Sequence, residues 1–149
     1  MSDINTAKGP NVLMILSSVF MTFGSLITGS ILMWERAFML HNHIFLTGSD
    51  MVTAFLALVL IILEVIYIIS VLLTRLKMMH YKGLTIKKLA VAMLILNIIL
   101  FIHCFICFAY LDNWVPEGYF TLADILILFT VPGIIVKILA LIGASRSAK

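Results

Sequence analysis

The chain has 149 residues, of which 63% are hydrophobic and 11% are charged, and its formal net charge is +3. A soluble domain has about 25% charged residues, so this composition argues against an ordinary water-soluble domain and indicates an integral membrane protein. Nucleic-acid binding is not expected, because in a membrane protein the positions of the positively charged residues mainly determine which side of the membrane each connection occupies.

Four segments are long and apolar enough to cross a bilayer, which takes roughly 20 residues at about 1.5 Å each. They lie at about 12–34, 51–74, 88–110 and 121–143. We predict an all-α integral membrane protein, a four-transmembrane-helix bundle with up-and-down topology and short connections. The whole chain, 1–149, is expected to form a single membrane domain whose main environment is the lipid bilayer.

The polar residues of the first segment are small and recur at steps of three and four: Ser18, Thr22, Ser25 and Gly29. This spacing places them on one face of a helix. Small residues spaced in this way let helix backbones approach closely in lipid. We therefore expect a helix-packing face, with the lining of a permeation path as the alternative.

The connection after the first segment contains His41 and His43. Two histidines at positions i and i+2 converge poorly on one metal ion, and no further ligand follows at a definite spacing. We expect a solvated loop and no metal site.

The second segment carries a single formal charge at its middle, Glu64, and Tyr67 lies on the same helical face one turn further on. A carboxylate near the centre of a bilayer is costly and usually faces the interior of a bundle or a wet cavity. Glu64 is therefore expected to have polar partners at the same depth.

Positive residues collect in the connection between the second and third segments and at the two termini. The former holds Arg75, Lys77, Lys82, Lys87 and Lys88, the latter hold Lys8, Arg146 and Lys149, and the other two connections hold only Arg36. Since positive residues gather on the cytoplasmic side, both termini are predicted to be cytoplasmic. The membrane is expected to be a plasma membrane or an inner membrane.

The third and fourth segments supply the remaining polar candidates. Asn97 lies at nearly the depth of Glu64, His103 lies several Å further outward, and Lys137 lies closer to the cytoplasm with a side chain long enough to reach back. Pro132 is expected to kink the fourth helix, because it removes a backbone donor and clashes with the preceding turn. Gly133 is expected to pack against another helix.

Two interpretations of Glu64 follow from its surroundings. In the first, which we favour, it pairs with Asn97, Tyr67 or Lys137 and fixes how the helices pack. In the second, it takes up and releases a proton as part of a small ion-coupled carrier. Together with His103, these residues form the expected intramembrane polar site.

The only cysteines, Cys104 and Cys107, form a C-x-x-C pair inside the third segment. Thiol–quinone oxidoreduction needs a reactive thiolate and a second cysteine pair to relay electrons, and the chain has no second pair. Cysteines among Phe and Ile residues are mostly small hydrophobic side chains. No haem or other cofactor is expected, because the remaining histidines fall in connections.

No catalytic motif occurs in the sequence, so no catalytic residue is predicted. The sequence favours a non-enzymatic membrane component that forms a homo-oligomer or serves as an accessory subunit, with other membrane subunits, of a transport or secretion complex. The alternatives are a proton- or ion-coupled carrier or channel that uses Glu64, and a thiol–quinone oxidoreductase that uses Cys104 and Cys107.

Overall fold

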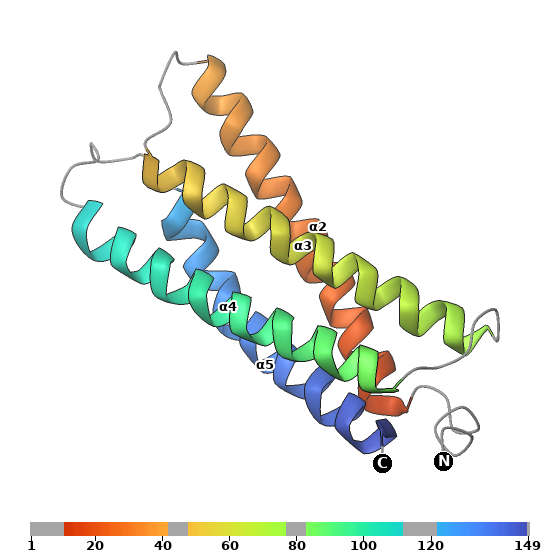
Figure 1. Ribbon diagram of the computed structural model, residues 1–149. Coiled ribbons are helices and arrows are strands. Elements are labelled where there is room, and N and C mark those ends of the chain that lie inside the picture. The colour runs from red at the N-terminus through yellow and green to blue at the C-terminus, as the bar shows by residue number, and fades with distance from the viewer. Residues whose placement is uncertain (1–10, 42–47, 77–82, 112–121, 149) are drawn as a thin grey trace.

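The computed structural model describes residues 11–41, 48–76, 83–111 and 122–148, and the regular structure in these ranges is entirely helical. Four helices follow one another along the chain and lie side by side (Figure 1). They are α2 (Val12–His41), α3 (Gly48–Arg75), α4 (Gly83–Leu111) and α5 (Leu122–Ala148). All four are long and apolar enough to cross a membrane, as predicted.

The helices form a closed ring of neighbours in chain order. α2 packs against α3, α3 against α4, α4 against α5, and α5 back against α2, whereas α3 and α5 touch only slightly across the bundle. The contact between α4 and α5 is the most extensive. Because consecutive helices run in opposite directions, α2 begins and α5 ends at the same end of the bundle (Figure 1).

Each helix is longer than its predicted membrane segment. α2 extends seven residues beyond the predicted end at position 34, and His41 is its last residue instead of part of a loop. His43 lies outside the described residues. α5 continues through Pro132 as one helix and does not break there.

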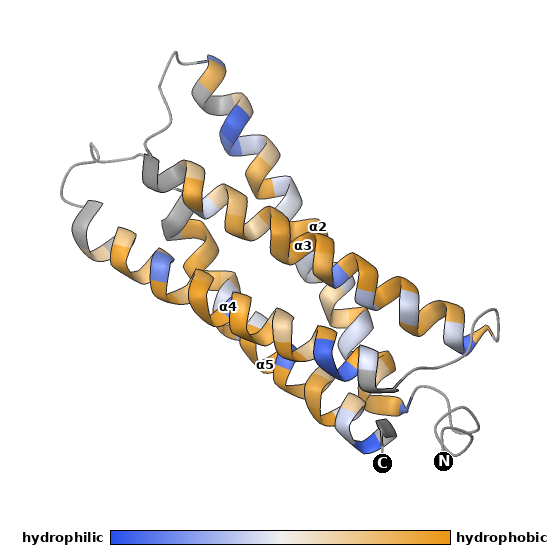
Figure 2. Cartoon of the chain, viewed as in Figure 1, coloured by the Kyte–Doolittle hydropathy of each residue, from blue (hydrophilic) through white to orange (hydrophobic). Residues whose placement is uncertain are grey.

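Large hydrophobic side chains cover the outside of the bundle and several polar or charged side chains lie inside it, which is the reverse of a soluble protein. Between 22% and 28% of the apolar stretch of each helix is buried inside the bundle, and its other residues are half-buried or exposed. Large aliphatic and aromatic side chains cover these outer faces, and hydrophobic residues dominate all four helices in Figure 2. The buried positions include Glu64, Lys137 and Asn97. Such a surface suits hydrocarbon better than water.

Glycines allow close helix contacts at two places, both on α5. A Cβ atom added to Gly133 would lie 2.9 Å from Asn97 Oδ1 of α4, and one added to Gly143 would lie 2.9 Å from Met14 Cγ of α2. At Gly143 the contact is reinforced by Asn11, whose Nδ2 donates to Gly143 O (2.7 Å) and whose Oδ1 accepts from the backbone N–H of Met14 (3.0 Å). Asn11 thus caps α2 and also joins it to α5.

The predicted packing face of α2 is divided between the inside and the outside of the bundle. Ser18 is buried, and Ser25 makes a contact with α3 described below, but Thr22 is exposed. A Cβ atom added to Gly29 or to Gly24 would meet no described atom within 4 Å. The close helix approach that we expected at Gly29 is therefore not made within the described part of this chain.

Candidate functional site

One polar residue from each helix lies close to the middle of the bundle. The apolar windows are Val12–Ala37, Met51–Arg75, Thr85–Cys107 and Ile125–Arg146, so their midpoints fall at about residues 24 or 25, 63, 96 and 135 or 136. The polar residue of each helix lies within two positions, or about 3 Å, of that midpoint. These residues, which we call the polar centre, are Ser25, Glu64, Asn97 and Lys137.

The core of the polar centre is an ion pair between α3 and α5. Lys137 Nζ donates to Glu64 Oε1, and Ser25 Oγ of α2 donates to Glu64 Oε2. Glu64 is 5% exposed and Lys137 is 4% exposed. Both carboxylate oxygens thus have a donor, and three helices are joined through one side chain. Such compensation is needed because an isolated buried charge costs several kcal/mol.

Asn97 attaches α4 to the same layer through the backbone of α5. Its Nδ2 donates to Thr130 O at 3.1 Å, and its side chain rests on Gly133. Thr130 Oγ1 in turn donates to Ile127 O at 3.0 Å. Side-chain hydrogen bonds therefore surround the turn that contains Pro132, where the backbone ladder lacks one N–H. Any residue larger than glycine at position 133 would force the Asn97 side chain to move.

Tyr67 and His103 lie apart from the polar centre. Tyr67 is fully buried one turn from Glu64, and its hydroxyl lies 3.2 Å from Ser17 Oγ of α2, which gives a second polar contact between α2 and α3. His103 is half-buried, and its Nε2 lies 3.5 Å from Cys107 Sγ on the same helix. Six residues separate His103 from Asn97, which is about 9 Å along α4.

Sequence reasoning missed the polar roles of Ser17 and Ser25. Ser25 was expected only to pack, yet it completes the hydrogen bonding of Glu64. Ser25 lies near the midpoint of the first segment, as Glu64 does in the second. This common depth was the available signal, because polar residues of two neighbouring helices can meet only where they lie at the same level. The position of Asn11 directly before an apolar run was likewise a signal for a helix cap.

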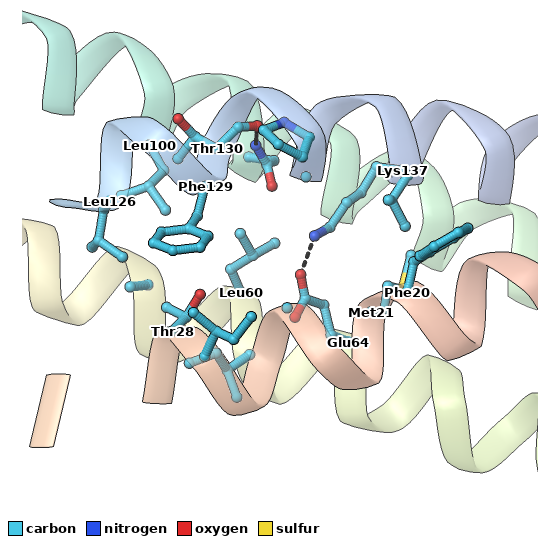
Figure 3. A pocket seen from close by; sticks show the side chains of 18 of the residues that line it. Phe20, Met21, Thr28, Leu60, Glu64, Leu100, Leu126, Phe129, Thr130 and Lys137 are labelled. Atoms are coloured by element: carbon cyan, nitrogen blue, oxygen red, sulfur yellow. Dashed lines mark hydrogen bonds and ion pairs between the residues drawn. The ribbon is translucent and has the colours of Figure 1, made fainter. Parts of the chain in front are cut away.

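A cavity of about 240 Å³ adjoins the polar centre. Glu64, Asn97 and Lys137 line it, and the rest of its wall is mainly aliphatic and aromatic, as Figure 3 shows for Leu60, Leu126 and Phe129. In Figure 3 the ion pair lies between these side chains and Phe20 and Met21. The cavity therefore combines an apolar wall with a few convergent polar groups, which is typical of small-molecule sites.

The cysteine pair lies elsewhere on α4. Cys104 and Cys107 are buried and are not joined by a disulfide. Among the described residues, no three His, Cys, Asp or Glu side chains are placed to hold a metal ion.

We predict that the ion pair stabilises the fold as a unit. Lys137→Met should lower the free energy of unfolding by about 3–5 kcal/mol, because it leaves a buried carboxylate without its cation. Adding Glu64→Leu should restore most of that loss. Equilibrium unfolding in mild detergent, for the wild type, both single variants and the double variant, measures the coupling.

The exposed Lys87 of α4 provides the matched control for this cycle. Lys87→Met removes the same charge from a solvated position and should change stability by less than about 1 kcal/mol. A double variant whose loss equals the sum of the two single losses would show that Glu64 and Lys137 are not coupled.

Chemically, the polar centre offers one carboxylate, one ammonium group, one amide and one hydroxyl in a setting of low polarity. Such a set can hold helices in register, exchange a proton, or hydrogen-bond a small ligand; it contains no activated nucleophile. Comparisons of the chain with protein-family models, with curated proteins and with solved structures find no match.

Proposed function

We propose that this chain is a multi-pass integral membrane protein with four spans and with both termini in the cytoplasm. The outward-facing apolar surface of all four helices supports insertion. The orientation is supported by charge, since Arg75 and the exposed Lys87 and Lys88 lie at the end of the bundle where α2 begins. Arg36 is on the opposite half of α2.

Within that membrane we propose a non-enzymatic role, as a self-assembling oligomer or as an accessory subunit of a larger transport or secretion complex. The observation that carries this proposal is the unused half of the packing face of α2. Gly29 has open space beside it, and Thr22 is exposed. Small residues on an outer face favour close contact with a further helix in lipid.

The polar centre is consistent with such a structural role. Glu64 is neutralised by Lys137 and receives a second hydrogen bond from Ser25, so its charge is satisfied by this chain's own helices. Buried polar contacts of this kind can specify one helix register over others. The chain then presents a defined, largely apolar exterior to its partners.

A carrier or channel for protons or other ions is the second candidate, and the position of the Glu64 carboxylate near the middle of its helix favours it. Glu64 and Lys137 both line the cavity beside the ion pair, so a displacement that separates the two side chains would leave the carboxylate facing that cavity. Carboxylates at membrane depth that face a cavity commonly mark ion pathways.

We predict the orientation of the termini from the charge distribution. The native cysteines are first removed by Cys104→Ala and Cys107→Ala, and one new cysteine is introduced by Ser2→Cys or by Asp112→Cys. Intact cells that express each variant are then treated with a membrane-impermeant maleimide. Cysteine at position 112 should react directly, and cysteine at position 2 only after the cells are made permeable. The opposite pattern would reverse the proposed orientation.

We predict that the open half of the α2 face contacts another helix in the native assembly. In the same cysteine-free background, Gly29→Cys should form an oxidative cross-link to a second copy or to a co-purifying subunit. Ile99→Cys, exposed at a similar depth on α4, is the matched control and should not. A monomer that cross-links at neither position and retains no partner in mild detergent contradicts the assembly role.

If the protein carries ions, Glu64 should set the pH dependence of transport. Purified protein in vesicles should move protons or cations down a gradient, and Glu64→Gln should abolish the pH dependence of this flux. His103→Gln, outside the cavity lining, serves as the control and should leave it unchanged. Flux whose pH profile is the same in Glu64→Gln and the wild type removes the carrier reading.

A further inference from the structure

The cavity beside the polar centre opens in one direction, between α2 and α5. Its lining residues from α3 and α4 are buried or half-buried, whereas its exposed lining residues all belong to α2 or α5. The exposed set consists of Phe20, Phe23 and Ile27 from α2 and Pro132 from α5. The opening is at mid-height of these helices, away from both ends.

The position of the opening limits what can enter. If the chain lies in a bilayer as proposed above, on which this inference rests, the opening faces the hydrocarbon core. Water and ions are scarce there, because transferring them into hydrocarbon is costly. A molecule that enters between α2 and α5 must therefore be soluble in the membrane itself.

Hydrogen-bonding capacity inside the cavity remains unused by the described part of the chain. The Lys137 ammonium has three N–H donors, and Glu64 accepts one. Asn97, which is 2% exposed, uses Nδ2 as a donor to Thr130 O, while its Oδ1 receives no hydrogen bond from a described residue. Donors of Lys137 and an acceptor of Asn97 are thus both available.

These two groups lie near one another along α5. The Asn97 side chain packs on Gly133, and Lys137 follows Gly133 by four residues, which is about one helical turn on the same face. One small polar group in the cavity can therefore address both. Because the Glu64–Lys137 pair is already neutral, a charged ligand would add an uncompensated charge, whereas a neutral group would not.

A hydroxyl group meets these requirements. It accepts a hydrogen bond from an ammonium and donates one to an amide oxygen, and it carries no charge. The apolar wall, which includes Leu60, Leu100 and Phe129, suits the carbon atoms next to such a group. A cavity of about 150 Å³ lined by similar residues is enough to bind benzene, so about 240 Å³ admits a head of ring size or larger.

We propose that this cavity binds a neutral membrane-soluble alcohol, with the hydroxyl between Lys137 and Asn97 and the tail leaving between α2 and α5. Long-chain, polyprenyl and sterol alcohols share this chemistry. A fatty acid differs by its charge, and a lipid ether differs by the loss of the hydroxyl donor. These differences make the proposal testable with simple lipids.

The experiment uses the full chain in mild detergent and a tritiated hexadecanol that carries a photoreactive diazirine. The probe should label saturably, and unlabelled hexadecanol should compete for the site. Hexadecyl methyl ether should compete about fivefold less well, because it cannot donate to Asn97 Oδ1. Palmitate should compete less well than hexadecanol. Stronger competition by a polyprenol or a sterol than by hexadecanol would assign the tail class.

Two small-to-leucine variants test the location. Gly24 lines the cavity and has open space where a side chain would begin, so Gly24→Leu should fill the opening and reduce specific labelling at least tenfold. Ala92 is exposed on α4 and is not part of the cavity lining, so Ala92→Leu should leave labelling unchanged.

A third variant tests the hydrogen bond of the hydroxyl. In Asn97→Leu, hexadecanol should no longer compete better than its methyl ether.

Unsaturable labelling, equal competition by alcohol and ether in the wild type, or full labelling of Gly24→Leu overturns the proposal. Its failure is distinguishable from failure of the proposed membrane function, because the maleimide pattern and the cross-link at position 29 are measured independently of any lipid. Correct orientation with no saturable alcohol site would overturn this inference alone.

Discussion

A buried carboxylate that must be neutralised within an apolar interior is the constraint on which the bundle depends. Glu64 faces neighbouring helices because leaving it against hydrocarbon costs several kcal/mol. Its compensation draws Lys137 from α5 and Ser25 from α2 to one level. Rotating either partner helix by one residue, about 100°, would carry its side chain away from Glu64. The register of α2, α3 and α5 is therefore tied to a single side chain.

The rest of the bundle extends this pattern of sparse polar links between apolar helices. Asn97 joins α4 to α5, Ser17 and Tyr67 join α2 to α3, and Asn11 joins the start of α2 to the end of α5. Where hydrophobic burial does not drive association between helices, such links and close packing at small residues supply specificity. Gly133 and Gly143 provide that packing on α5.

Much of this arrangement was predictable from the sequence, for identifiable reasons. Apolar length predicted the four helices, and depth along each segment placed Asn97 level with Glu64 and Lys137 within its reach. The contact between Tyr67 and Ser17 was not predictable, because it depends on which helix packs against α3 at the level of Tyr67. The spacing of Ser18, Thr22, Ser25 and Gly29 defines a face but cannot say which part of it a neighbour covers. The cavity depends on side-chain volumes across four helices, which periodicity does not encode.

The shared depth of the two charges has an electrical consequence in a bilayer. A neutral pair whose members lie at one level has almost no dipole along the membrane normal, so a transmembrane voltage does not act on it. Protonation of Glu64 would leave the charge of Lys137 halfway through the field. Since a full crossing is worth about 2.3 kcal/mol per 100 mV, that state would feel roughly half, or about 1 kcal/mol. In a bilayer, the intact pair would therefore contribute almost nothing to voltage sensitivity.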